Sequence, residues 1–331
     1  MELDTVPMGR TGLQVSEISF GTWRFGRETE SGAVEIDERR AHDLLDAYAE
    51  HGGRFIDTAD VYGGGISEEW IGDWLSGRDR EEFVVASKSY WQAREGDPNG
   101  RGLGRKHLRR QIDEILDRLG TDYLDVYYTH RWDDATPHEE FMRTLDGLVE
   151  SGRVNYLGAS TMYPNAWKVA MANEFAERRG YEPFTVTQPR YNLVNREIEA
   201  NYLDMVREFG MGVCPWSPLG AGFLTGKYER DADLPDDSTA SDSQRWKDRY
   251  LTESNFDALD VVRAVADEVD ASPAQVAIAY QLHHPDVTAP IVGARTVDQL
   301  EENLGAAAVE LSDEQFERLR DAKPHPLAHL E

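Results

Sequence analysis

The 331-residue chain lacks the features that would place it in a membrane or in an oxidising compartment. No run of about 18 apolar residues occurs, so no segment is expected to span a bilayer. The N-terminal residues Met1–Asp4 lack the basic and apolar stretches of a signal peptide. The only cysteine, Cys214, cannot form an internal disulfide, which is typical of a cytoplasmic protein. No cationic residue flanks Cys214 in its apolar run, so we expect a buried, unreactive thiol.

Positive charge is also scarce, because 35 Lys and Arg residues stand against 62 Asp and Glu residues. Nucleic acids and anionic membranes need basic patches, so neither is expected as a partner. The net charge of −27 is dispersed along the whole chain. An acidic partner surface and adaptation to high salt are both possible explanations. The dispersed pattern favours a halophilic protein, because charge repulsion is screened within about 3 Å at 1 M salt.

Short, strand-like apolar runs recur along the chain, and amphipathic helical segments separate them. The eight expected strands are Glu17–Phe20, Arg54–Ile56, Phe83–Ser87, Tyr123–Thr129, Val154–Ala159, Phe184–Thr187, Gly212–Pro215 and Ala289–Val292. Eight such β-then-α units predict an all-parallel sheet closed into a (β/α)8 TIM barrel. An open doubly wound sheet is the alternative, and it would more often carry a G-x-G-x-x-G turn, which this sequence lacks.

Three segments fall outside this repeat. Residues 1–15 contain a turn at Gly9–Gly12 and are expected to form a hairpin that closes the bottom of the barrel. Residues 89–102 and 228–254 are expected to be long loops after the third and seventh strands, and such loops are often functional. No linker interrupts the pattern, so residues 1–331 are expected to form one domain.

The chemistry of a barrel enzyme lies at the C-terminal ends of its strands. Asp57, Lys88 and His130 follow the second, third and fourth expected strands, and Tyr62 stands just after Asp57. A free phenol has a pKa of about 10, and a nearby ammonium lowers it. We therefore expect Tyr62 to protonate a carbonyl oxygen while Lys88 lowers its pKa. Asp57 would hold Lys88, and His130 would hydrogen-bond the oxygen.

Each of these residues alone is more often structural than catalytic. Asp57 and Lys88 could be an ordinary ion pair, Tyr62 a loop aromatic, and His130 a hydrogen-bonded strand end. Their joint occurrence at successive strand ends favours an active site, because burying an unpaired Lys88 would cost several kcal/mol.

Four long motifs resemble the aldo-keto reductase superfamily, and the resemblance extends from end to end. They are Phe55–Gly63, Thr121–Asp125 leading to His130, Gln188–Asn192 and Trp216–Gly220. The chain is similar to the branch that holds potassium channel β subunits and related bacterial and archaeal reductases. The resemblance implies that Asp57, Tyr62, Lys88 and His130 are the catalytic tetrad.

The resemblance also implies NADP(H), bound extended and without a Rossmann domain. Ser160 and Gln188 would hydrogen-bond the nicotinamide carboxamide, and Trp216 would stack on the ring. The pyrophosphate would lie along Ser217, Leu219, Gly220, Leu224 and Lys227. The adenosine end would be held by Gly293, Arg295, Thr296, Gln299, Glu302 and Asn303.

The residues at the adenosine end favour NADP(H) over NAD(H). A helix is expected to begin after Thr296, and helix N-termini bind phosphate. Arg295 beside it offers a planar fork for a 2′-phosphate, although it could also be an exposed loop cation. One departure from the family concerns Thr161, which stands where many members have Asn. A hydroxyl cannot replace both polar groups of an amide.

The substrate pocket is expected to include Trp23, Trp91 and Trp132, whose alternative role is ordinary packing at the barrel top. Small aldehydes or ketones are the expected substrates, and no metal-ligand spacing occurs. An NADP(H)-binding redox-sensing subunit is a second hypothesis. A cofactor-free isomerase or aldolase with a Schiff base on Lys88 is a third. A monomer and a homo-oligomer are both consistent with the sequence.

Overall fold

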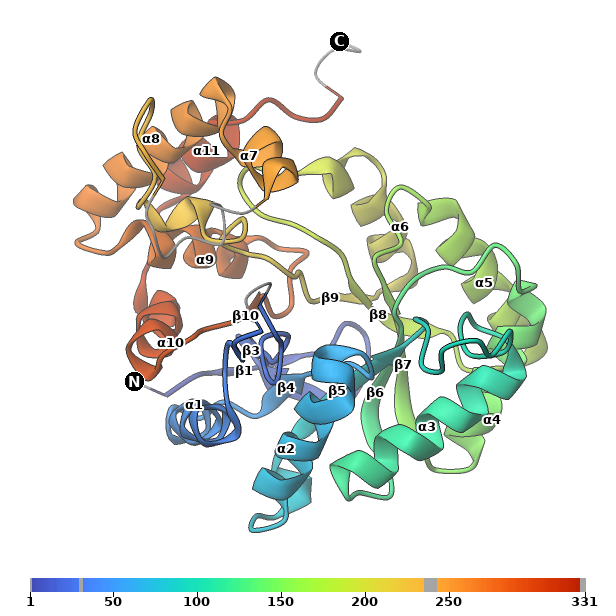
Figure 1. Ribbon diagram of the computed structural model, residues 1–331. Coiled ribbons are helices and arrows are strands. Elements are labelled where there is room, and N and C mark those ends of the chain that lie inside the picture. Colours follow the sequence, from blue (N-terminus) through green and yellow to red (C-terminus); the bar gives the residue numbers. More distant parts are fainter. Residues whose placement is uncertain (1, 30–31, 235–242, 328–331) are drawn as a thin grey trace.

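The computed structural model describes residues 2–29, 32–234 and 243–327 (Figure 1). Its centre is an eight-stranded parallel sheet with the order β10-β3-β4-β5-β6-β7-β8-β9. The strands are β3 (Ser19–Gly21), β4 (Phe55–Asp57), β5 (Val84–Ser89), β6 (Leu124–Thr129), β7 (Val154–Ser160), β8 (Phe184–Gln188), β9 (Gly212–Val213) and β10 (Ile291–Val292). A parallel bridge between Trp216, just after β9, and Ile291 of β10 joins the two ends. The predicted (β/α)8 fold is confirmed, and all eight expected strands are present.

Helices cover the outside of the sheet. They are α1 (Glu38–Glu50), α2 (Ile66–Leu75), α3 (Arg105–Leu119), α4 (His138–Glu150), α5 (Ala166–Arg179), α6 (Tyr202–Phe209), α7 (Gln244–Tyr250), α8 (Glu253–Glu268), α9 (Pro273–His283), α10 (Val297–Leu304) and α11 (Asp313–Asp321). The sequence explains α3, because Leu108, Ile112 and Ile115 are buried on one face and Gly120 ends the helix in a left-handed conformation. Contacts between α1 and α10 complete the ring of helices.

An antiparallel hairpin covers the N-terminal end of the barrel, as predicted. It consists of β1 (Thr5–Pro7) and β2 (Gln14–Ser16). Met8 and Val15 join the buried cluster inside the barrel, beside Cys214. Gly9 has a positive φ, and a Cβ there would lie 2.4 Å from the backbone nitrogen of Gly212, so the close approach needs glycine. Burial raises the pKa of the Cys214 thiol, as expected of an unreactive cysteine.

The segment 228–254 differs from the predicted loop, because it contains helix α7. Ser243 caps this helix, and the buried rings of Trp246 and Tyr250 pack against Tyr228 and Phe223. Trp246 and Tyr250 are the only buried residues of this short helix and stand in a polar sequence, so too few apolar residues recur at helical spacing to predict a helix. Residues 235–242 of the predicted loop lie outside the described residues. The loop predicted at residues 89–102 is present after β5.

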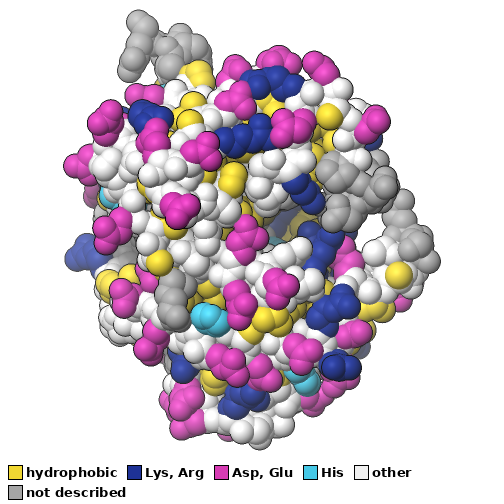
Figure 2. Space-filling view, turned by 90° about the vertical axis from the view of Figure 1, so that its left-hand side faces the viewer, with side chains coloured by type: hydrophobic (Ala, Val, Ile, Leu, Met, Phe, Trp, Pro, Cys, Tyr) yellow, Lys and Arg dark blue, Asp and Glu magenta, His cyan; other side chains and the backbone are white. Residues whose placement is uncertain are grey.

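Acidic side chains are spread over the face of the molecule that carries α1 and α10, and Lys and Arg side chains gather beside a hollow in that face (Figure 2). None of the helices within the described residues is long and apolar enough to cross a membrane.

We expect the melting temperature to rise steeply when KCl is raised from about 0.1 M to about 2 M, because salt screens the repulsion among dispersed carboxylates. Differential scanning calorimetry would measure the change, with sorbitol of equal osmolality as the control for excluded-solute effects. A flat response to KCl would contradict a halophilic adaptation.

Candidate active site

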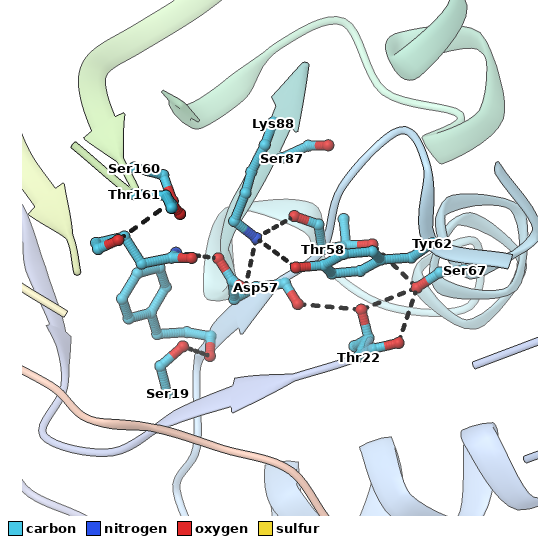
Figure 3. Close-up of polar contacts among 12 residues, drawn as sticks. Ser19, Thr22, Asp57, Thr58, Tyr62, Ser67, Ser87, Lys88, Ser160 and Thr161 are labelled. Carbon is cyan, nitrogen blue, oxygen red and sulfur yellow. Dashed lines mark hydrogen bonds and ion pairs between the residues drawn. The ribbon is translucent and has the colours of Figure 1, made fainter. Parts of the chain in front are cut away.

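Four polar residues meet at the C-terminal rim of the barrel, and three of them, Asp57, Tyr62 and Lys88, are labelled in Figure 3. Asp57 ends β4, Lys88 lies in β5, His130 follows β6, and Tyr62 begins the 3₁₀ turn Tyr62–Gly65. The Lys88 Nζ lies 2.7 Å from Asp57 Oδ2 and 3.3 Å from the hydroxyl oxygen of Tyr62. The ring centroids of Tyr62 and His130 are 6.1 Å apart. The structure thus brings together all four residues that the sequence singles out.

Lys88 is fully buried and uses all three of its ammonium donors. It donates to Asp57, to Tyr62 and to the carbonyl oxygen of Thr58, the last at 2.7 Å. Burial by itself lowers the pKa of Lys88, but Asp57 and Tyr62 outweigh that effect and the pKa is raised. Lys88 is therefore charged at neutral pH. A Schiff base needs an uncharged amine, so this environment disfavours the aldolase hypothesis.

The pKa of Tyr62 differs from the sequence-based expectation. Burial raises the pKa of the phenol above its ordinary value, and the Lys88 ammonium opposes this shift without reversing it. The expected net lowering is wrong because the pattern of strand ends carries no information on how deeply the ring is buried. The phenol of Tyr62 is therefore protonated at neutral pH, which is the state a proton donor requires.

His130 is a neutral imidazole at neutral pH. Burial, with a smaller contribution from the positive charge of Lys88, lowers the pKa of His130 to about 3. Its Nδ1 is buried and has no hydrogen-bond partner among the described residues. The ring meets Tyr62 edge-on on one side and Trp91 on another, the latter at 6.1 Å between centroids. His130 can therefore hydrogen-bond an oxygen atom held beside Tyr62 without contributing a charge.

A chain of buried hydroxyl groups, which was not predicted from the sequence, fixes the loop that carries Tyr62. The Ser67 hydroxyl lies 2.9 Å from that of Thr58 and donates to that of Thr22 at 2.8 Å (Figure 3). Thr22 in turn donates to the carbonyl oxygen of Asp57 at 3.0 Å. Thr58 lies in the Phe55–Gly63 motif and Thr22 follows β3, and only the fold shows that their hydroxyl groups share Ser67 as a partner.

Asp60 is a second buried carboxyl group beside the site, and no role for it was predicted from the sequence. Its backbone N–H donates to the carbonyl oxygen of Lys88, and neither carboxyl oxygen has a hydrogen-bond partner among the described residues. Burial, followed by the nearby charge of Glu68, raises the pKa of Asp60 well above its usual value. Glu68 itself accepts from Arg118 and Ser87. Burial therefore favours the neutral form of the Asp60 carboxyl group.

Gln188, Ser160 and Thr161 lie next to the tetrad. Gln188 ends β8, and its amide N–H donates to Asp57 Oδ1 at 2.7 Å. Ser160 ends β7, and its hydroxyl lies 3.2 Å from both the backbone oxygen of Gln188 and the hydroxyl of Thr161. Thr161 is exposed and has a φ of 54°. The three residues form a polar group at the rim beside Asp57.

The segment after β9 holds the residues expected beside the nicotinamide ring and the pyrophosphate. Trp216 is half-buried, and the Arg190 guanidinium lies 6.0 Å from its ring centroid. Ser217 has a φ of 61°, and its hydroxyl accepts from the N–H of Ala221 at 3.0 Å. Leu224 is fully buried in the core, so only its backbone can meet a ligand. Of the other residues expected along the pyrophosphate, Leu219 is partly buried, Gly220 is buried and Lys227 is exposed.

The residues expected at the adenosine end gather at the start of α10. Thr296 caps the helix by accepting from the N–H of Gln299, so the predicted helix start is confirmed. The Gln299 side chain accepts from the N–H of Arg295, and Asn303 donates to the carbonyl oxygen of Gly293 at 3.3 Å. Glu302 is exposed on the same helix.

Two further arginines, Arg24 and Arg27, lie beside Arg295 and were not predicted from the sequence. Glu35 Oε1 lies 2.9 Å from Arg24 and 3.7 Å from Arg295, while its Oε2 lies 3.5 Å from Arg27. Burial lowers the pKa of Arg24; the charges of Arg295 and Arg27 add to that effect, and Glu35 opposes it. Arg24 and Arg27 follow β3, far from Arg295 in sequence, so only the closed barrel brings the three guanidinium groups together.

The three tryptophans expected in the substrate pocket have different surroundings. Trp91 contacts the ring of His130, as described above. Trp23 is 48% exposed and lies under the Arg27 guanidinium, 3.9 Å from its ring centroid. Trp132 is buried edge-on against Phe141 of α4, with ring centroids 5.2 Å apart. Trp91 is thus the one of the three that contacts a member of the tetrad.

A family model described as the aldo/keto reductase family matches residues 17–324. The chain belongs to the aldo/keto reductase family. The resemblance seen in the sequence is therefore confirmed. Members of this family generally use NAD(P)H, and the match supports an oxidoreductase.

Three relatives are similar to this aldo/keto reductase over at least 91% of its chain. It is 34% identical over 319 residues to "Norsolorinic acid reductase" of Aspergillus flavus, covering 95% of this chain and 79% of the relative. It is 34% identical over 330 residues to "Uncharacterized oxidoreductase YrpG" of Bacillus subtilis, covering 96% and 95%. It is 35% identical over 308 residues to "Probable voltage-gated potassium channel subunit beta" of Oryza sativa subsp. japonica, covering 91% and 90%.

Proposed function

We propose that this aldo/keto reductase, acting as a single barrel domain in the cytoplasm, reduces small aldehydes or ketones to alcohols with NADPH, reversibly. The observation that carries the proposal is the buried Lys88, which bonds Asp57 and Tyr62 at the C-terminal rim of the barrel. A purely structural ion pair between Lys88 and Asp57 would not require the Tyr62 hydroxyl beside it. A monomer and a homo-oligomer both fit this function.

The proposed acid is the protonated phenol of Tyr62. NADPH supplies the hydride for the carbonyl carbon when it is bound. As the carbonyl oxygen gains negative charge, Tyr62 gives it a proton, and the ammonium of Lys88 stabilises the resulting phenolate. Asp57 keeps Lys88 charged and in place. The neutral imidazole of His130 orients the carbonyl oxygen by a hydrogen bond.

The residues around the rim fit a nicotinamide dinucleotide. The amide of Gln188 contains both donors and an acceptor, and the Ser160 hydroxyl lies next to this residue, which matches the donors and acceptors of a carboxamide. Trp216 is half-buried at the same rim and offers a flat face to the nicotinamide ring. The guanidinium groups of Arg24, Arg27 and Arg295 surround one carboxylate group beside α10. Such a cluster suits a 2′-phosphate, so we propose NADP(H) as the cofactor.

Arg295→Gln is expected to raise the dissociation constant for NADPH about tenfold and to leave that for NADH nearly unchanged. The physical reason is that only NADPH carries the phosphate that the guanidinium group would bind. Quenching of tryptophan fluorescence measures both constants. Arg39→Gln, an exposed arginine of α1, is the control. Equal weakening of NADPH and NADH by Arg295→Gln would contradict the assignment of the 2′-phosphate to this cluster.

A redox-sensing subunit is a second candidate, favoured by the similarity to the probable channel subunit beta. Mixing the protein with NADPH and a panel of uncharged and charged aldehydes, and following the nicotinamide absorbance, separates the candidates. Turnover supports the reductase. Tight NADPH binding without turnover on any carbonyl supports the sensor. Absence of NADPH binding would contradict both.

A further inference from the structure

A cavity lies outside the tetrad, between the loop after β5, the loop after β6 and the first turn of α3. Its volume is about 740 Å³, and the helices α3 and α4 beside it lie side by side (Figure 1). Asp133 ties the two loops together by accepting from the N–H of Leu103 at 2.9 Å, and it also accepts from the N–H of Ala135 in its own loop at 3.0 Å. Gly102 has a φ of 87°, and a Cβ there would lie 2.6 Å from Asp133 Oδ2. The walls of the cavity are therefore held by specific contacts.

The cavity carries an excess of positive charge in a chain of net charge −27. Four basic side chains line it and form no ion pair within the described part of the chain: Arg101, Arg105, Lys106 and Arg131. Three carboxylates share the wall: Asp133, Asp134 and Glu140. One of these, Asp134, pairs with Lys168, so four positive charges face two uncompensated negative ones. An anion is the ligand that such a cavity attracts.

The N-terminus of α3 opens into this cavity without a side-chain cap. The N–H of Arg105 donates to Glu140 at 3.1 Å. The next two N–H groups, those of Lys106 and His107, donate to no acceptor among the residues that the structure describes. Free N–H groups at the positive end of a 15-residue helix favour a bound anion.

A buried histidine supplies an independent sign of a ligand. His107 lines the cavity and is 1% exposed. Its Nδ1 lies 3.4 Å from the Arg110 guanidinium and accepts from it, so the ring hydrogen is on Nε2. That Nε2 is buried and has no partner among the described residues. A buried donor without an acceptor costs free energy, and an anion in the cavity would remove this cost.

We propose that this cavity binds a phosphate group. The donors are the N–H groups at the start of α3, the Nε2–H of His107, and the side chains of Arg105, Lys106 and Arg131. A tetrahedral oxyanion accepts from all these directions at once, and helix N-termini combined with guanidinium groups are suited to it. Arg131 follows His130 directly, and its guanidinium lies 5.9 Å from the ring centroid of Trp91. The phosphate site therefore adjoins the mouth of the active site.

Inorganic phosphate is the probe for the first experiment. Potassium phosphate replaces KCl at constant ionic strength and pH 7, and NMR follows the ring nitrogens of protein labelled with ¹⁵N-histidine. His107→Gln assigns the His107 signal. We expect a saturable shift of His107 Nε2. The phosphate dissociation constant should rise about tenfold in Arg105→Gln and in Lys106→Gln.

Arg109→Gln is the matched control, because Arg109 is exposed on the same helix but lies outside the cavity. It should leave the phosphate dissociation constant unchanged. A non-saturable shift of His107, or an equal loss of phosphate binding in Arg109→Gln, would overturn the proposal. Because the measurement needs no turnover, its failure is distinguishable from a failure of the proposed reductase activity.

The phosphate could be free or part of the substrate, and kinetics distinguish the two. Glyceraldehyde and glyceraldehyde 3-phosphate are compared as substrates of the unmodified protein and of Lys106→Gln. If Lys106→Gln raises KM for glyceraldehyde 3-phosphate but not for glyceraldehyde, the cavity binds the phosphate group of the substrate. Equal KM values in the two proteins, together with phosphate binding by NMR, identify free phosphate as the ligand.

Discussion

Tyr62→Phe is expected to lower kcat for carbonyl reduction by about 10²–10⁴-fold, which is the usual contribution of a positioned general acid. The substitution removes one hydroxyl group and leaves the bonds of Lys88 to Asp57 and Thr58 in place. The fold and the affinity for NADPH should therefore change little. Stopped-flow and steady-state measurements of nicotinamide absorbance give kcat, and fluorescence quenching gives the NADPH affinity.

Tyr90→Phe is the matched control, since Tyr90 is a second buried phenol, directly follows β5 and lies outside the tetrad. It should retain nearly full activity. If Tyr62→Phe turned over as fast as Tyr90→Phe, the phenol of Tyr62 would not be the proton donor.

The pH dependence of the unmodified protein follows from the raised pKa of Tyr62. The reduction needs the protonated phenol, so kcat/KM for reduction should persist up to about pH 10 and fall above it. Alcohol oxidation needs the phenolate, so kcat/KM for oxidation should rise as the pH increases above about 10. His130, with a pKa of about 3, should produce no inflection near pH 6.5. A loss of reductase activity centred below pH 8 would contradict these assignments.

Lys88→Met is expected to lower the free energy of unfolding by about 3–5 kcal/mol, because it leaves the buried carboxylate of Asp57 without its positive partner. Reductase activity should fall at least about a hundredfold, since the ammonium no longer stabilises a phenolate at Tyr62. Urea denaturation at high KCl measures the stability of the variant.

Two comparisons separate a buried ion pair from a general loss of packing. The double variant Asp57→Asn/Lys88→Met removes both charges and should be more stable than Lys88→Met alone, while remaining inactive. Arg178→Met breaks the exposed pair of Arg178 with Glu174 and should cost less than about 1 kcal/mol. A Lys88→Met variant as stable as Arg178→Met would show that the Asp57–Lys88 pair contributes little to folding.

Local patterns in the sequence predicted the elements and the end of the barrel at which the chemistry lies. Eight apolar runs separated by amphipathic segments were sufficient for the (β/α)8 fold, because parallel strands need helical crossovers. Asp57, Lys88 and His130 could be assigned to one rim because parallel strands present their C-terminal ends together. Thr296 marked the start of α10, since its hydroxyl and the turn that follows are local features. Helix α7 was missed because its anchors, Trp246 and Tyr250, stand in a polar sequence.

Only the tertiary structure decided the properties that depend on burial and on contacts between distant segments. The pKa of Tyr62 is raised because desolvation of the phenol exceeds the effect of Lys88, and no local pattern reports desolvation. Closure of the barrel brings Arg24 to Arg295 and Gln188 to Asp57. The cavity beside α3 likewise forms only where two loops meet a helix N-terminus. The sequence by itself determined which groups are present and at which end of the barrel they lie, while packing determined their charge states and their partners.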